Sequence, residues 1–257
     1  MPPPPQLAEW STDLRVAVGF LTRVPVGEIG PVGGVGSLSR ATRVYPVVGL
    51  GIGLAGGAAY WLAAALGLPP LIAGLIAVAA TMGLTGALHE DGLADTADGF
   101  GGGADPERKL EIMRDSRTGA YGAAVLVLSI AIRGTALAAL AAPAAVVLAL
   151  AAAHAISRAC LPAAMATLPL ARSSGLAVAT GRPETRDAGI ALSLAAAVAV
   201  LAQGFGAGLA TLLAGVLGAA LVAWLARAQI GGYTGDVLGA LQQAAEIAVL
   251  LTAVALA

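Results

Sequence analysis

Long stretches that are almost free of charge alternate along the chain with short polar segments. The first covers residues 44–88 and is interrupted only by Pro69-Pro70. Because one transmembrane helix takes roughly 20 residues, this stretch predicts two spans, at about 44–66 and 70–88. Residues 119–141 and 144–168 are separated near Pro143 and predict a second pair of spans.

The last third of the chain continues the pattern. Residues 188–226 carry no charge and are weakly interrupted at 203–206, which predicts a third pair, and residues 237–257 predict a last span that contains Glu246. We therefore expect an all-α fold, a polytopic transmembrane bundle of about seven spans, with six as the alternative. The whole chain, 1–257, forms one integral membrane domain, and its polar segments are 89–118, 169–187 and the start of 227–257.

Basic residues are distributed unequally between the predicted loops. The turns near 67–69, 142–143 and 203–206 contain no Arg or Lys, whereas twelve of the fourteen basic residues fall on the opposite side and only Arg133 and Arg158 lie within spans. The positive-inside rule makes the basic side cytoplasmic. The sequence thus predicts a multi-pass protein of the cell (inner) membrane, with segment 89–118 in the cytoplasm.

The N-terminal segment is too short and too charged to be a span. Over residues 10–26, apolar side chains recur at helical spacing, starting with Trp10, Leu14 and Leu21. This pattern predicts an interfacial helix on the cytoplasmic leaflet. The preceding Met1 and four prolines lack the features of a signal peptide.

Glycines recur every four residues in the first predicted span. Gly49, Gly53 and Gly57 would share one helix face, and small residues at this spacing allow two transmembrane helices to approach closely. We expect this face to be scaffold and to hold no ligand.

Composition agrees with a membrane protein and excludes several other classes. Hydrophobic residues make up 58% of the chain and charged residues 11%, against about 25% charged in an average soluble domain. The net charge of −1 argues against a nucleic-acid partner, which would need a basic surface. The single cysteine, Cys160, and two histidines make a zinc site improbable.

The segment His89–Asp98 contains the most unusual chemistry. Asp91, Asp95 and Asp98 are spaced i, i+4, i+7, so a helix would place all three on one face. Repulsion between like charges on one face destabilises a helix. A divalent cation bound to the three carboxylates would remove this repulsion and stabilise the helix. Hard oxygen ligands without thiolates indicate Mg²⁺ or Mn²⁺. A solvated acidic loop is the alternative.

A mixed-charge segment follows over residues 108–122. Arg114 and Arg117 flank Asp115, and guanidinium groups are suited to binding phosphate oxygens. A loop of structural salt bridges explains the same residues equally well.

Ionisable residues also occur inside the predicted spans. His154 and Arg158 are four residues apart and share a helix face, and Arg133 and Glu246 lie in other spans. Such groups are costly in a membrane and usually face a polar interior. They indicate either a pocket for an anionic ligand or a structural pair.

The segment before the last span adds two more candidates. Thr234 or Asp236 could cap the final helix. Asp236 also lies on the same predicted membrane face as the acidic segment, so it could complete a cation site.

Three of these motifs resemble the signatures of the cobalamin synthase family, the adenosylcobinamide-GDP ribazoletransferases. They are LHEDGLADTADG at 88–99, IMRDSRTGAYG at 112–122 and GYTGDVLGA at 232–240. The motifs FLTRVP at 20–25 and YPVVG at 45–49, together with Ser157-Arg158, extend the likeness from about residue 10 to the end. Tyr45 stands where the family more often has Phe.

The resemblance implies a membrane-bound, Mg²⁺-dependent transferase in the last steps of cobalamin biosynthesis. Its substrates would be adenosylcobinamide-GDP and α-ribazole, or α-ribazole 5′-phosphate, and GMP would be released. As a hypothesis, Asp91, Asp95 and Asp98 bind the metal with help from Glu90 or Asp236, and one carboxylate accepts the proton of the attacking hydroxyl. The predicted substrate-binding residues are Arg114, Asp115, Arg117, His154, Arg158 and Thr234.

Two other protein classes share part of the pattern. A CDP-alcohol phosphotransferase also uses paired aspartates, but its motif expects Ala-Arg where Asp95 stands, and its second acidic run is missing here. A secondary transporter would place polar groups near the middle of the membrane, often between repeats, and the sequence shows no internal repeat. The oligomeric state stays open.

Overall fold

The computed structural model describes residues 5–27 and 35–257, and their regular structure is helical apart from one isolated parallel bridge between Leu170 and Tyr233. In chain order, the elements are α1 (Pro5–Leu21), α2 (Val35–Ala41), the short 3-10 helix η1 (Thr42–Val44), α3 (Tyr45–Ala65), α4 (Pro70–Thr85), α5 (Leu88–Gly102), α6 (Pro106–Ile112), α7 (Ala120–Leu140), α8 (Pro143–Thr167), α9 (Leu176–Thr180), α10 (Thr185–Gln203), α11 (Phe205–Ile230) and α12 (Gly235–Ala255).

The prediction of a polytopic all-α bundle is confirmed. Six helical segments of the described chain are long and apolar enough to cross a membrane, and the bent pair α4–α5 makes a seventh if it counts as one span. Apart from 70–88, the observed helices agree with the predicted spans to within a few residues, because Pro143 and Gly204 start or separate them. For 70–88, α4 begins at Pro70 but passes as a span only together with α5.

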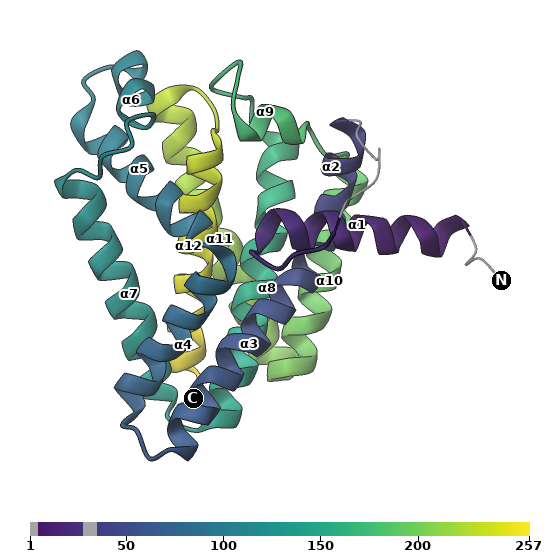
Figure 1. The fold of residues 1–257 in the computed structure, drawn as a ribbon, viewed down its shortest axis with the longest axis vertical. Helices are drawn as coiled ribbons and strands as arrows, with labels where there is room; N and C mark the ends of the chain where they lie inside the picture. The colour runs from purple at the N-terminus through teal and green to yellow at the C-terminus, as the bar shows by residue number, and fades with distance from the viewer. Residues whose placement is uncertain (1–4, 28–34) are drawn as a thin grey trace.

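One helix forms the centre of the bundle. The most apolar stretch of α8 is 78% buried, against 22% in α11, and α8 packs against α3, α10, α11 and α12. The short connections after α3, α7 and α10 gather at one end of the molecule, while α5, α6 and α9 lie at the other (Figure 1). The basic residues of α6, of the segment before α7 and of the connection around α9 therefore lie at one end, which we call the α5 end.

Segment 89–118, predicted as a polar cytoplasmic connection between two spans, is mostly helical. Gly86 and Ala87 both adopt left-handed backbone angles and end α4, so α5 starts at an angle of 93° to it. Arg23 fixes this bend, since its backbone N–H donates to the Leu84 carbonyl at 2.8 Å. The bend carries α5 across the end of the bundle (Figure 1).

The N-terminal helix lies crosswise to the bundle (Figure 1). It spans Pro5–Leu21, somewhat before the predicted 10–26. Asp13 is fully buried and its carboxylate pairs with Arg40 at 3.1 Å and Arg43 at 2.7 Å. Arg43 also lies over the Trp10 ring. These contacts join α1 to α2 and η1, and its interfacial position stays a prediction.

The predicted glycine face forms the contact between α3 and α8. A Cβ atom on Gly53 would collide with the backbone of Leu150 and Ala151, and one on Gly49 or Gly57 would meet the backbone of α8 in the same way. The backbones of α3 and α8 are therefore in direct contact. Any side chain larger than the hydrogen of glycine at these three positions would keep the two helices apart.

We expect Gly53→Ala to destabilise the protein by about 2–3 kcal/mol, because the added methyl group has no space and the backbones must separate. Thermal unfolding of the detergent-solubilised protein measures this. Gly51→Ala is the matched control, since a Cβ at Gly51 meets nothing within 4 Å. Equal unfolding temperatures for the two variants would contradict the close contact.

Candidate functional site

The acidic residues of α5 differ strongly in exposure. Because α5 is helical, Asp91, Asp95 and Asp98 follow one face, as their spacing predicts. Asp91 is exposed, Asp95 is half-buried and Asp98 is buried at 7% exposure. The three carboxylates therefore have different surroundings despite their regular spacing.

Asp98 is held by the start of α7. Its carboxylate accepts hydrogen bonds from the backbone N–H groups of Gly119 at 2.7 Å and Gly122 at 2.9 Å. A Cβ atom on either glycine would collide with this carboxylate. The N-terminal end of a helix stabilises negative charge, so Asp98 joins α5 to α7 and is less available to a metal ion than the sequence indicated.

Asp236 lies against α5 because two glycines let α12 and α5 touch. A Cβ atom on Gly92 would come within 2.7 Å of the Asp236 carbonyl oxygen, and one on Gly239 within 3.1 Å of the Gly92 Cα. Thr234 caps α12, since its hydroxyl accepts the Val237 N–H at 3.2 Å and donates to the Asp236 carboxylate at 3.1 Å. The contact brings motifs 88–99 and 232–240 together.

Sequence reasoning missed Arg172 as a site residue. The pairing of Leu170 with Tyr233 places this loop arginine beside α12, where Nη1 lies 3.2 Å from the Asp236 carboxylate and Nη2 donates to the Leu110 carbonyl. Its pKa is lowered by partial burial, although Asp236 favours its charged form. No motif around Arg172 indicates this position, because the pairing joins segments far apart in the chain.

Negative charges crowd around Asp95. Burial raises the pKa of Asp95 to about 7, and the neighbouring carboxylates of Asp91, Asp236 and Asp98 add to the shift. Arg172 opposes it only weakly. Ionised Asp95 therefore lacks compensating charge, which is the electrostatic condition that a bound cation would relieve.

The donor set fits Mg²⁺ only in part. Within 5–27 and 35–257, no three His, Cys, Asp or Glu side chains are grouped closely enough to hold one ion by themselves. Mg²⁺ usually binds proteins through one or two carboxylates and completes its shell with water and substrate phosphates. Two of the three carboxylates of Asp91, Asp95 and Asp236 would fit that second arrangement.

The mixed-charge segment 114–118 is largely exposed, and Asp115 and Arg117 within it pair with each other. The guanidinium of Arg117 lies 2.6 Å from the carboxylate of Asp115, and these hydrogen bonds lower the pKa of Asp115 to about 2 and raise that of Arg117. Arg114 is exposed. The structure thus shows a salt bridge here and leaves the predicted phosphate binding untested.

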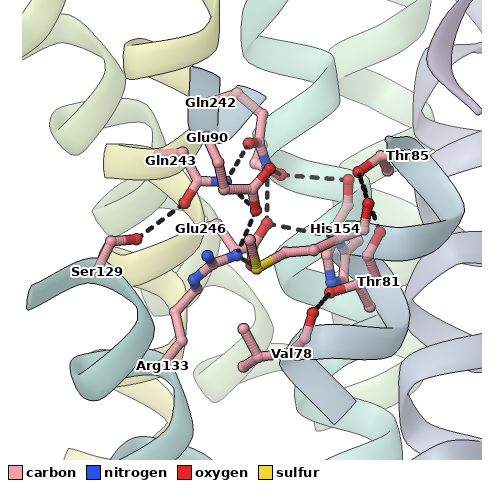
Figure 2. A network of polar contacts seen from close by, with 12 residues as sticks. Val78, Thr81, Thr85, Glu90, Ser129, Arg133, His154, Gln242, Gln243 and Glu246 are labelled. Atoms are coloured by element: carbon pink, nitrogen blue, oxygen red, sulfur yellow. Dashed lines mark hydrogen bonds and ion pairs between the residues drawn. The ribbon is translucent and has the colours of Figure 1, made fainter. Parts of the chain in front are cut away.

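The intramembrane charges meet in one buried network (Figure 2). Arg133 of α7 pairs with Glu90 at 3.0 Å and Glu246 at 3.2 Å, and Arg158 of α8 pairs with Glu246 at 3.3 Å. Nδ1 of His154 lies 2.6 Å from Arg158. Two arginines thus face two glutamates, and each of these side chains is at most 6% exposed.

Amide and hydroxyl groups add hydrogen bonds to the network. Gln242 donates to Glu246 at 2.7 Å and Gln243 donates to Glu90 at 3.2 Å. The hydroxyl of Ser129 donates to the side chain of Gln243 (Figure 2). The hydroxyl of Ser157 accepts a hydrogen bond from the side chain of Gln242. The side chains of Glu90, His154 and Arg158 are therefore held by contacts between helices, and none of them lines the cavity described next. Glu90 was predicted to be catalytic, and His154 and Arg158 were predicted to bind substrate.

A cavity of about 230 Å³ opens beside the acidic face of α5. Asp91, Arg172, Thr234 and Asp236 lie in its wall, and the rest is largely apolar. It is bounded by residues of α1, α3, α5, α8, α9 and α12. Of the sequence-predicted site residues, the structure thus brings Asp91, Thr234 and Asp236 into one cavity.

Comparison with known proteins gives one consistent result. A model of the cobalamin-5-phosphate synthase family matches residues 13–254. The chain is 51% identical over 243 residues to an adenosylcobinamide-GDP ribazoletransferase of Bradyrhizobium diazoefficiens, covering 95% of this chain and 93% of the relative. The enzyme of the same name from Mesorhizobium japonicum is 47% identical, with 94% and 92% covered. No solved structure is detectably similar.

We expect Arg158→Ala to destabilise the protein by about 3–5 kcal/mol, because Glu246 and His154 lose a buried partner inside the bundle. Unfolding of the solubilised protein by heat or denaturant measures the change. Arg117→Ala is the control: it also removes a guanidinium from an ion pair, but an exposed one, and should have no measurable effect on stability. A neutral Arg158→Ala would show that the network does not hold the helices together.

Proposed function

Because the chain belongs to the cobalamin-5-phosphate synthase family, we propose that it is a membrane-embedded transferase that joins adenosylcobinamide-GDP to α-ribazole and releases GMP. This is the final step of cobalamin synthesis. The observation that carries the proposal is the meeting of motifs 88–99, 112–122 and 232–240 at the α5 end, through Asp98 with Gly119 and Gly122 and through Gly92 with Gly239.

The reaction replaces the anhydride oxygen between the two phosphorus atoms of adenosylcobinamide-GDP with an ester oxygen from α-ribazole. A ribose hydroxyl of α-ribazole attacks the phosphorus that carries the cobinamide, a new P–O bond forms, and the P–O bond to GMP breaks. The hydroxyl loses its proton, which needs an acceptor, and GMP departs with added negative charge. A carboxylate within reach of the hydroxyl can accept the proton, and Asp91, exposed at the cavity wall, is the residue we assign to this role.

We assign metal binding to Asp95 and Asp236, with water and substrate phosphates completing the coordination shell. A bound Mg²⁺ would neutralise the pyrophosphate and the charge that develops on GMP. The support is the uncompensated charge around Asp95 and the exclusion of Asp98 by its bonds to α7. Glu90 stays with Arg133 in this proposal and positions α5.

Positive groups at the α5 end would bind the remaining phosphate oxygens. Arg172 is already beside Asp236 and lines the cavity. Arg114 and Arg117 lie on the exposed segment before α7, where Arg117 would have to exchange Asp115 for phosphate. The same groups would accommodate α-ribazole 5′-phosphate. We further propose that the protein lies in the cell inner membrane with its α5 end in the cytoplasm, as the basic loops indicate.

Asp95→Asn should lower the rate of GMP release by about 10²-fold or more, because one carboxylate that would bind the metal loses its charge. The assay supplies adenosylcobinamide-GDP, α-ribazole and Mg²⁺ to the purified protein in detergent or vesicles and measures GMP. Glu107→Gln is the matched control, since it removes one exposed negative charge from the neighbouring α6. Undiminished, Mg²⁺-dependent transfer by Asp95→Asn would refute the assignment.

Affinity for Mg²⁺ should fall as the pH decreases below about 7. The raised pKa means that Asp95 is increasingly protonated below this value in the metal-free protein, and a protonated carboxyl must release its proton before it binds a cation. The loss should approach tenfold per pH unit and disappear above about pH 8. Calorimetric titration with Mn²⁺ measures it. The dependence should be absent in Asp95→Asn, and a constant affinity in the wild type would contradict the prediction.

A further inference from the structure

Aromatic side chains form one wall of the cavity beside α5. Phe20 of α1 and Tyr45 of α3 both line it, and their rings are stacked with centroids 6.0 Å apart and planes 16° from parallel. Leu161 and Met165 of α8 add aliphatic and thioether surface. A flat apolar ring placed here could stack on the aromatic pair and contact the sulfur of Met165.

The size of the cavity restricts what it can hold. A cavity of about 150 Å³ in another protein binds benzene, so the volume of about 230 Å³ found here suits a bicyclic aromatic ring. The corrin ring is several times larger than benzene and does not fit. Of the proposed substrates, only a nucleobase-sized group can therefore be enclosed.

Two polar side chains in the wall, His89 and Arg172, each have a buried nitrogen without a hydrogen-bond partner. His89 precedes the acidic face of α5, is 3% exposed and lines the cavity. Its Nδ1 atom is buried and has no hydrogen-bond partner. A buried polar group without a partner is costly, and an imidazole N–H can donate to a ring nitrogen of a heterocyclic base.

The polar part of the wall fixes the direction of a bound ligand. Asp91, Asp236 and Arg172 lie in the same cavity as the aromatic pair. A base enclosed next to Phe20 and Tyr45 would leave its sugar near these charged groups, where the transfer takes place in the proposed function.

We propose that this cavity binds the dimethylbenzimidazole base of α-ribazole, with its ribose directed toward Asp91 and Asp236. The inference rests on the proposed function and adds to it the place and pose of one substrate. The base carries two methyl groups and one free ring nitrogen, which match a largely apolar wall in which Nδ1 of His89 lacks a partner. Guanine, the other base among the substrates, has several donors and acceptors along its edge, and a largely apolar wall would leave some of them unpaired.

The experiment narrows the cavity and compares the two substrates. Ala177 of α9 is 6% exposed and lines the cavity, so Ala177→Leu should raise the KM for α-ribazole at least about tenfold. The KM for adenosylcobinamide-GDP should stay within about twofold. Ala179→Leu, an exposed position of the same short helix outside the cavity wall, is the matched control and should change neither constant.

A complementary variant enlarges the cavity. Met165→Ala should improve the use of a riboside with a tricyclic base, naphthimidazole, relative to α-ribazole, whereas Met82→Ala, which truncates a half-buried methionine of α4 outside the wall, should not. Misfolding cannot produce this gain in relative rate, so the result stays interpretable if Ala177→Leu fails to fold.

The outcomes separate this inference from the function on which it rests. If the wild type releases no GMP from the two substrates, the proposed function fails. If the wild type is active but Ala177→Leu raises the KM for adenosylcobinamide-GDP instead, the cavity holds guanine and the inference is wrong. Unchanged constants in Ala177→Leu together with unchanged base preference in Met165→Ala would also overturn it.

Discussion

The buried pairing of two arginines with two glutamates is the interaction on which the rest of this structure depends. An isolated charge inside a membrane protein is expensive, and it is tolerated when a partner of opposite sign and additional hydrogen bonds surround it. Arg133, Arg158 and Glu246 come from three different helices, and Glu90 joins them from α5. Removing any one of these side chains leaves a buried charge on another helix without its full set of partners. The network therefore determines which helices are neighbours, because apolar contacts in a membrane favour many helix pairings about equally.

Glycine contacts supply the second constraint. Gly53 brings α3 onto α8, and Gly92 with Gly239 brings α5 onto α12. Such contacts set distances between backbones, whereas the ion network selects the partners. Together, the glycine contacts and the ion network hold α5 across the end of an apolar bundle. They do so although the carboxylates of α5 repel one another.

This architecture separates the roles of neighbouring residues in the motif 88–99. Glu90 is directed into the network and positions α5, while Asp91 reaches the cavity wall and Asp98 joins α7. Successive residues of a helix differ in direction by about 100°, so a single segment can serve the scaffold and the proposed reaction at once. Since the polar end of the cavity adjoins an aromatic wall, the fold offers a place for a flat base beside the charged groups.

The sequence by itself determined the spans, the end of the bundle that carries the basic loops, the glycine face of α3 and the common face of the three aspartates. These features depend on hydrophobic length, loop composition and helical periodicity, which are properties of continuous segments. Tertiary structure alone decided that Asp98 is bound by α7, that His154 and Arg158 both meet Glu246 and that Arg172 joins Asp236. The partners in these contacts are far apart in the chain, as are Arg172 and Asp236, 64 residues apart. Which charge meets which, and whether a carboxylate stays free for a ligand, follows from helix packing that no local pattern encodes.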